Sequence, residues 1–501
     1  MNDRRFDALL TEALPEPPSE IINSITPWQR AFRMILTGLG MTSVTLNFLC
    51  LQYLLPAIGM LLLLLGFRRL RKENEWFTAC FALSVLRCIL FYPSLILYAT
   101  VYSEALAQNG VFPILSGIQI TLLFLLIGCL HRGIRKLQSE NGLKPHAASA
   151  VGLLIWYAIV CILGISGYSG LLLGIPMLLC YLLMLYCLHK LSKEIATAGY
   201  AASMQQTTLS DGAVAGSIAA LTAIGILCGF IFFADYPMHW TPQKQDEHSP
   251  ITDICQKLTD LGFPKEILAD MNSEDILQMR DAFQVTVTQH DHPVNDGREV
   301  VEVKDGTYHH TTVYDQNELR ITQIAVELSG DCRRFYLVHH FEWVITPKFY
   351  GTEAMQFWTA DHLDGWMIEH APTGRVLYSE NGTEYTANYY TLGTESYQYN
   401  SLFADIFGNQ QKSDLFAAFS LPNTGERHRG YVSYGIIERT DGCIIDSWIN
   451  YLHQKHPWQY PHTTAKQHRK TRSGLEDRVF HLTQDALQLT PYPQGEYQLF
   501  S

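Results

Sequence analysis

Six long apolar stretches, separated by short polar segments, occupy the first half of the chain. They cover residues 45–67, 76–102, 111–130, 147–165, 169–188 and 213–234. A helix needs about 20 apolar residues to cross a bilayer, because each residue advances the helix by about 1.5 Å. The six stretches are close to this length or longer, and they hold few charges. The pattern therefore predicts a transmembrane helical bundle of about six spans over residues 43–236.

A shorter amphipathic segment precedes the first apolar stretch. Its apolar side chains recur on one helical face: Trp28, Phe32, Ile35, Leu36 and Leu39. We expect residues 28–42 to form an interfacial helix that lies on the membrane surface. The alternative is that this segment helps to form a seventh span, which would change only the side of the N-terminus. Residues 1–27 are polar and contain several prolines, so we expect a flexible tail there.

The hydrophobic pattern changes to a period of two in the second half of the chain. Residues 237–282 contain a polar linker and then three short segments with helical spacing. From residue 283, apolar and polar residues alternate, and turn signals such as Asn381-Gly382 separate the runs. We therefore predict a mostly antiparallel β domain, of the sandwich or jelly-roll type, over residues 283–501. Within it, we expect residues 475–487 to be helical.

Basic residues gather in alternate loops of the predicted bundle. The loops that follow the first, third and fifth spans hold these residues, whereas residues 103–110 and 166–168 hold none. The basic residues are Arg68, Arg69, Arg71, Lys72, Arg132, Arg135, Lys136, Lys144, Lys190 and Lys193. Loops rich in Lys and Arg stay in the cytoplasm. We therefore expect the β domain to be extracytoplasmic, in a multi-pass protein of the cell membrane.

The formal net charge of −12 comes from the second half of the chain. Residues 241–501 hold 21 Lys or Arg and 36 Asp or Glu, which gives that half a formal charge of −15. Phosphate backbones bind to basic surfaces. The charge therefore argues against nucleic acid as a partner, and the lipid bilayer is the partner that the sequence predicts most directly.

Four residues with a charged or amide side chain lie inside the predicted spans, where such groups are costly. They are Arg87, Asn47, Gln52 and Gln119, and Arg87 lies near the middle of its span. One interpretation is a polar path in which Arg87 meets an anion. The other, which we favour, is that these groups form hydrogen bonds between helices and fix their packing.

Aromatic residues are dense in the predicted β domain. The most distinctive group is Trp448, Tyr451, Trp458 and Tyr460. Such side chains can form a stacking platform for a ligand, and they are the candidate binding residues. The core of a sandwich also uses large aromatic residues, and this interpretation remains open beside the first.

Motifs for catalysis or metal binding are not evident. The sequence has no GxSxG, HExxH or CxxC motif and no Gly-rich phosphate loop. His290 and His292 would face the same side of a strand, but a zinc or copper site needs three or four converging ligands. We therefore interpret them as exposed histidines and assign no catalytic residue, metal or cofactor.

Several motifs resemble those of uncharacterised multi-pass membrane proteins of anaerobic Gram-positive bacteria. They are Pro27-Trp28, Thr45-Leu46-Asn47-Phe48, Leu51 to Pro56, Gly66 to Arg71, Leu261 to Pro264, Leu268-Ala269-Asp270 and Asn450-Tyr451 through Tyr460-Pro461. The resemblance implies a bacterial cell membrane. It implies no activity, and it transfers no functional residue to this chain.

The sequence therefore favours a membrane protein that presents an extracytoplasmic β domain. We expect this domain to bind a cell-envelope component or partner protein, or to sense the state of the envelope. Two alternatives remain. One is a transporter or permease-like component with a polar path near Arg87, and the other is an envelope hydrolase. A role without catalysis is the favoured one.

Overall fold

The computed structural model divides the chain into two compact units. The first comprises residues 1–98 and 105–228, and the second comprises residues 99–104 and 229–501. The structure describes residues 27–43, 46, 50–166, 171–198, 200, 209–243, 251–304, 307–362, 364–399, 410–471, 479–491 and 497–499.

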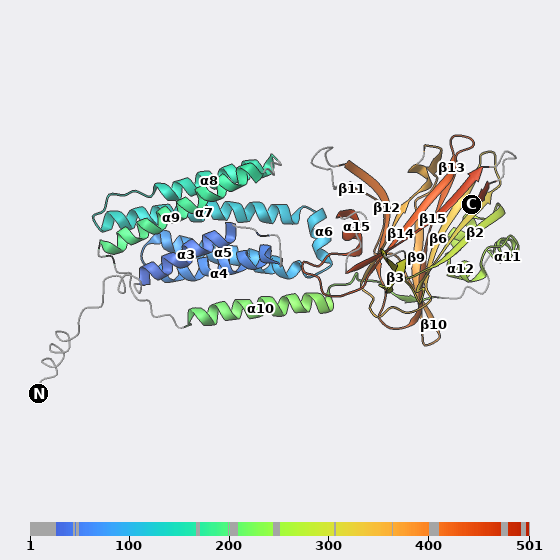
Figure 1. Cartoon of the computed structure of the whole chain (residues 1–501), viewed down its shortest axis with the longest axis horizontal. Helices are drawn as coiled ribbons and strands as arrows, with labels where there is room; N and C mark the ends of the chain where they lie inside the picture. Colours follow the sequence, from blue (N-terminus) through green and yellow to red (C-terminus); the bar gives the residue numbers. More distant parts are fainter. Residues whose placement is uncertain are drawn as a thin grey trace, which may run out of the picture. The chain divides into compact units, whose positions relative to one another are not determined.

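Among the described residues, six helices are long and apolar enough to cross a membrane (Figure 1). They are α4 (Leu51–Leu70), α5 (Glu75–Leu97), α7 (Val111–Glu140), α8 (Ala148–Ile165), α9 (Leu171–Thr197) and α10 (Asp211–Phe232). Large apolar side chains such as Ile155, Ile175 and Leu221 are exposed on the outside of the first unit. Lipid can cover such side chains, whereas their exposure to water is unfavourable. The six predicted apolar helices are thus confirmed, and the short helix α6 (Tyr102–Gln108) follows α5.

The amphipathic segment forms α3 (Pro27–Ser43), and its apolar face is covered by protein. The helix contacts α4 and α9, and the Trp28 indole donates a hydrogen bond to the Ser192 carbonyl oxygen at 3.1 Å. At the contact with α4, a Cβ added to Gly59 would lie 2.8 Å from the Gly38 carbonyl oxygen. Small residues that let two backbones approach closely are typical of helix pairs in membranes. This packing holds α3 against α4 and α9, and the interfacial position of residues 28–42 stays a prediction.

In the second unit, three consecutive short helices accompany a β sandwich. The helices are α11 (Thr252–Asp260), α12 (Lys265–Asp270) and α13 (Ser273–Gln278), as the spacing predicted. Their apolar residues, including Leu258 and Phe263, pack on the outer face of the larger sheet, where they meet Ile324 and Tyr336. The helices therefore cover one outer face of the sandwich.

All strand pairs in the two main sheets are antiparallel. The eight-stranded sheet has the order β1 (Thr241–Pro242), β10 (Thr383–Ala387), β9 (Thr373–Glu380), β13 (Glu426–Glu438), β6 (Arg334–Trp343), β5 (Leu319–Leu328) and β2 (Ala282–His292), with β8 (Trp366–Ile368) also on β13. The six-stranded sheet has the order β11 (Thr391–Tyr399), β12 (Gln410–Ser420), β7 (Thr352–Trp358), β14 (Ile445–Gln454), β15 (Phe480–Pro491) and β16 (Tyr497–Leu499). The predicted fold class is confirmed.

The core lies between the two sheets. Ile321, Phe341 and Val432 of the larger sheet pack against Phe357 and Phe419 of the smaller one. The turn between β9 and β10 has positive φ values at Asn381 and Gly382, which is the geometry that its Asn-Gly signal predicts. The short 3-10 helix η1 (Ala360–His362) follows β7, and α15 (Ala465–Thr471) lies beside the six-stranded sheet.

The helix expected over residues 475–487 is wrong from residue 480 onward, because that part belongs to β15. Its first residue, Phe480, pairs with Gln454, and the pairing with β14 continues through Leu489 opposite Ile445. Residues 475–478 lie outside the described residues. Pairing with a distant part of the chain satisfies the backbone of residues 480–487, although their local spacing predicted a helix.

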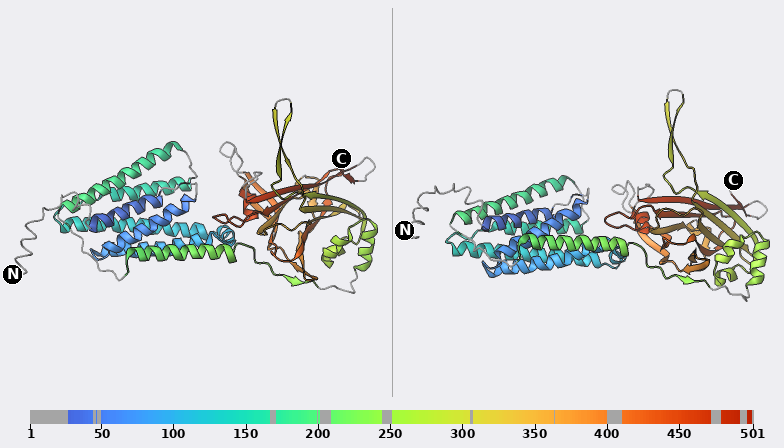
Figure 2. Two further views of the ribbon diagram at one scale, coloured as in Figure 1. Left: turned by 60° about the horizontal axis from the view of Figure 1, so that its bottom comes forward. Right: turned by 90° about the horizontal axis from the view of Figure 1, so that it is seen from below.

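A third, two-stranded sheet is formed by β3 (Arg298–Lys304) and β4 (Thr307–Val313). In both views of Figure 2 this hairpin projects away from the sandwich. The side chains of residues 310–317 are all exposed, which agrees with a hairpin that does not pack on either main sheet.

Candidate functional site

The intramembrane candidates do not converge on one site in the described residues. Arg87 is buried on α5, and its Nε donates to Gln119 Oε1 on α7 at 3.3 Å. The Gln119 amide nitrogen returns a hydrogen bond to the Arg87 carbonyl oxygen at 2.9 Å. Gln52 is half-buried in the first turn of α4, and Asn47 lies outside the described residues. The reciprocal bonds agree with helix packing, although Arg87 Nη1 is buried with no hydrogen-bond partner.

The four candidate aromatic residues lie in different environments. Tyr451 is fully buried between the sheets, where its hydroxyl accepts a hydrogen bond from the Trp343 indole at 3.1 Å. Trp448 lies on the opposite face of β14 and contacts Trp358. Trp458 and Tyr460 both contact Phe230. Trp458 and Tyr460 therefore share one aromatic partner, whereas Trp448 and Tyr451 lie on opposite faces of β14.

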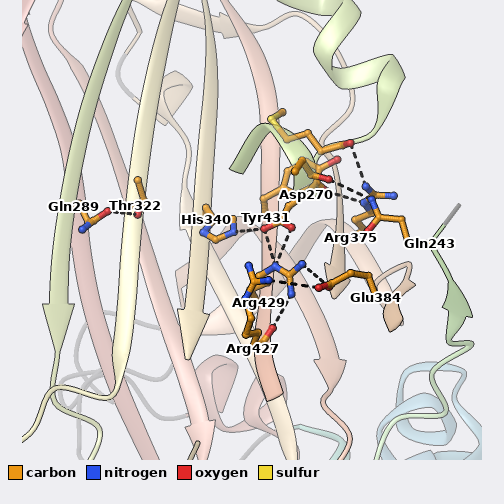
Figure 3. Close-up of polar contacts among 12 residues, drawn as sticks. Gln243, Asp270, Gln289, Thr322, His340, Arg375, Glu384, Arg427, Arg429 and Tyr431 are labelled. Carbon is orange, nitrogen blue, oxygen red and sulfur yellow. Dashed lines mark hydrogen bonds and ion pairs between the residues drawn. The ribbon is translucent and has the colours of Figure 1, made fainter. Parts of the chain in front are cut away.

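A buried charged network lies on the outer face of the eight-stranded sheet (Figure 3). Asp270, at the end of α12, accepts hydrogen bonds from Arg429 Nε on β13 at 2.9 Å. His340 Nε2 on β6 lies 3.1 Å from the same carboxylate. Arg429 also bonds to Glu384 on β10 at 2.7 Å. The network thus ties α12 to three strands of one sheet.

The side chain of Arg375 also joins this network. Arg375 donates to the backbone carbonyls of Asp270 and Met271, which end α12. Burial disfavours the charged form of Asp270, but the hydrogen bond from His340 and the charge of Arg429 outweigh it and lower the pKa of that carboxyl. No side-chain atom of Asp270, His340 or Arg429 is buried without a partner. A network whose polar atoms are all paired is typical of a structural element.

A second polar cluster lies between the two sheets, at the edge formed by β2 and β15. His290 Nδ1 is 3.1 Å and 3.0 Å from the two carboxylate oxygens of Asp485, and His292 Nε2 is 3.1 Å from Oδ2. The Asp485 side chain is 7% exposed, whereas that of His290 is 56% exposed. The cluster is therefore closed on the Asp485 side and open to solvent on the His290 side.

Several polar atoms next to this cluster are buried and lack a partner. They belong to Gln323 on β5, His339 on β6 and Thr483 on β15. Gln323 stands opposite Thr288 on one side and His339 on the other, and Thr288 is two residues before His290 on β2. Thr483 precedes Asp485 by two residues, so both face the interior. These residues form one polar patch on the inner faces of the sheets.

The interior also contains a serine–histidine pair. His339 Nε2 lies 3.0 Å from Ser447 Oγ, and Ser447 is also 2.7 Å from the Tyr434 hydroxyl. Burial lowers the pKa of His339 to about 3, with an opposing effect from the charge of Asp485. Both residues are fully buried. A nucleophile needs access to its substrate, so this pair gives no support to the hydrolase alternative.

The spacing of His290 and His292 predicts that they lie on one face of a strand, but no third ligand is evident from the local sequence. Asp485 is separated from His290 by 195 residues, and it lies in the segment that the spacing had assigned to a helix. The alternation of apolar and polar residues through Leu487 and Leu489 was the signal for a strand. Even so, only the packing of the sheets brings β15 next to β2.

No family model and no curated protein matches this chain. Ten chains among the solved structures match it. One of them, titled "Pore forming protein", is 7% identical, with coverage of 41% of this chain and 100% of that chain, and a TM-score of 0.18. Such a low TM-score carries no argument about fold or function.

Proposed function

We propose that this protein is anchored in the membrane by its helices and presents the β domain outside the cytoplasm to bind a partner. The partner is a protein or another component of the cell envelope. The observation that carries the binding role is the projecting hairpin β3–β4, and the orientation follows from the distribution of basic residues.

Two ion pairs within the first unit place its basic loops at one end of the bundle. Arg68 Nη1, at the end of α4, pairs with Asp211 at the start of α10 at 3.1 Å. Lys136 on α7 pairs with Glu75 at the start of α5 at 2.6 Å. The end of α10 at Phe232 is therefore opposite to the basic end. Positively charged loops remain in the cytoplasm, which supports an extracytoplasmic position for residue 235 onward.

The hairpin has the character of an interaction element. An isolated pair of strands is only marginally stable in water, and its outer edges carry unpaired backbone groups. Val301 and Tyr308 lie on the same face of the hairpin, and they are 48% and 70% exposed. An exposed edge can pair with a strand of a partner, while the neighbouring side chains provide specificity.

The orientation can be tested with a membrane-impermeant maleimide on intact cells. Cys332, in the turn between β5 and β6, is exposed and free. We expect wild type to be labelled at this residue and Cys332→Ser to lose that signal. In the Cys332→Ser background, Ser139→Cys at the basic end should be labelled only after the cells are permeabilised. The proposed orientation would be contradicted if Ser139→Cys were labelled in intact cells and Cys332 of wild type were not.

The binding role can be tested by site-specific photocrosslinking in intact cells. A photoreactive amino acid at Tyr308 should give a discrete crosslinked product with an envelope component. The matched control is the same amino acid at Leu499, an exposed residue on β16. Equal products at the two positions, or none at Tyr308, would argue against the hairpin as a binding element.

A further inference from the structure

We propose that His290, His292 and Asp485 bind one divalent transition-metal ion of the zinc class between the two sheets. Neutral imidazole nitrogens and a carboxylate oxygen are ordinary ligands of Zn²⁺. The three potential ligand atoms lie within 4.8 Å of one another. A three-residue set leaves one coordination position for water or for a bound molecule.

The nitrogen-to-oxygen distances in the cluster are close to those around a tetrahedral ion. With ligands about 2.0–2.1 Å from Zn²⁺, two ligand atoms on one ion are about 3.3 Å apart. The nitrogen-to-oxygen separations of 3.0–3.1 Å are close to this value. Both histidines lie on the same face of β2, and Asp485 comes from the other sheet, so the ligands converge from two sides.

Hydrogen bonds alone could also join these residues. Asp485 then accepts from both imidazoles, in addition to the backbone amide of Ala486 at 2.7 Å. Hydrogen bonds explain the contacts within the cluster, but they do not explain why polar atoms beside it are buried without a partner. A buried polar atom without a partner is rare in native structures and often marks an unseen water or ion.

The unpaired atoms beside the cluster are the independent observation in favour of an ion. Both polar atoms of the Gln323 side chain are buried without a partner, and so are His339 Nδ1 and Thr483 Oγ1. Gln323 and His339 are fully buried. Water in this part of the interior would satisfy these atoms and would also supply the open coordination position of the ion.

The position of the site assigns a structural role to the ion. β2 is the last strand of the eight-stranded sheet, and β15 lies one strand from the end of the smaller sheet. An ion held by both strands would join the two sheets at one open edge of the sandwich. Binding of the ion to the folded state would also stabilise the domain by mass action.

The test uses full-length protein in detergent, stripped of metal and then titrated with Zn²⁺ against a chromophoric chelator. We expect wild type to bind one equivalent and to unfold at a higher temperature with Zn²⁺ than without it. Asp485→Asn and His292→Gln should each weaken binding by about a hundredfold or more, since loss of a supporting residue alone costs about 10–100-fold. His310→Gln, on the exposed hairpin, is the matched control and should leave the affinity unchanged.

Substitution with Co²⁺ provides a second measurement that does not depend on the folding of variants. A site with two imidazoles and a carboxylate should give wild type the visible absorption of tetrahedral Co²⁺, and Zn²⁺ should displace it. The proposal is overturned if wild type binds less than one equivalent. It is also overturned if folded Asp485→Asn and His292→Gln keep the affinity of wild type.

Discussion

His339 and His340 are neighbours on β6, yet they lie in opposite environments. His340 faces outward and contacts Asp270 in the charged network beneath α12. His339 faces the interior between the sheets, where its Nδ1 has no partner. Both are buried. The outer network has all its central polar atoms paired, whereas the inner cluster leaves several unpaired.

This difference separates a structural network from a candidate site. Buried charges whose hydrogen bonds are complete hold elements in place and have little left to offer a ligand. Buried polar atoms without a partner carry an unfavourable free energy that a water or an ion can relieve. The outer network therefore explains how α12 is held on the sheet, and the inner cluster is the place to look for binding.

The largest effect is expected from Arg429→Leu in the outer network. The substitution leaves the Asp270 carboxylate buried without its cationic partner, and breaking a buried pair in this way costs about 3–5 kcal/mol. Chemical unfolding of the β domain, followed by tryptophan fluorescence, measures this loss. The control is Arg427→Leu, which removes a half-exposed pair with Glu384 and should cost less than about 1 kcal/mol. Equal losses in the two variants would show that the network is not structural.

A smaller effect is expected from pH, through His339. Burial lowers the pKa of His339 to about 3, whereas in the unfolded chain it is near 6.5, so below pH 6.5 the unfolded state binds more protons. The free energy of unfolding should therefore fall as the pH is lowered, by about 1.4 kcal/mol per pH unit from this group. His339→Gln removes this contribution, so its stability should change less than that of wild type between pH 6.5 and 4.5. Parallel pH profiles for the two proteins would contradict the assignment.

The smallest effect is expected from Gln323→Leu, and Tyr431→Phe, which also removes a polar group, provides the comparison. Tyr431→Phe deletes a hydroxyl that donates to Asp275 and accepts from the Asn272 amide, and it should destabilise the domain by about 1–3 kcal/mol. Gln323→Leu removes an amide that has no side-chain partner, so it should be nearly neutral or slightly stabilising. Chemical unfolding of metal-free protein provides both values. A loss in Gln323→Leu as large as that in Tyr431→Phe would show that water binds the Gln323 amide even when no metal ion is present.

The architecture could be predicted in outline because it depends on local patterns. Apolar length predicted the six helices, and alternation with turn signals such as Asn381-Gly382 predicted antiparallel strands. Predictions failed or stayed open where two distant segments decide the outcome. The contact of Gly38 with Gly59 places α3 beside α4, and pairing with β14 makes residues 480–491 a strand.

The sequence by itself determined the division into apolar helices and a β domain, because hydrophobic periodicity is set by neighbouring residues. It also identified His290 and His292 as residues on one face of a strand. Only the tertiary structure decided that Asp485 meets them, that Gln323 and His339 lie beside them, and that Trp448 and Tyr451 lie on opposite faces. Such contacts depend on which sheets pack together, and no local property of the chain specifies the partner of a side chain that lies nearly two hundred residues away.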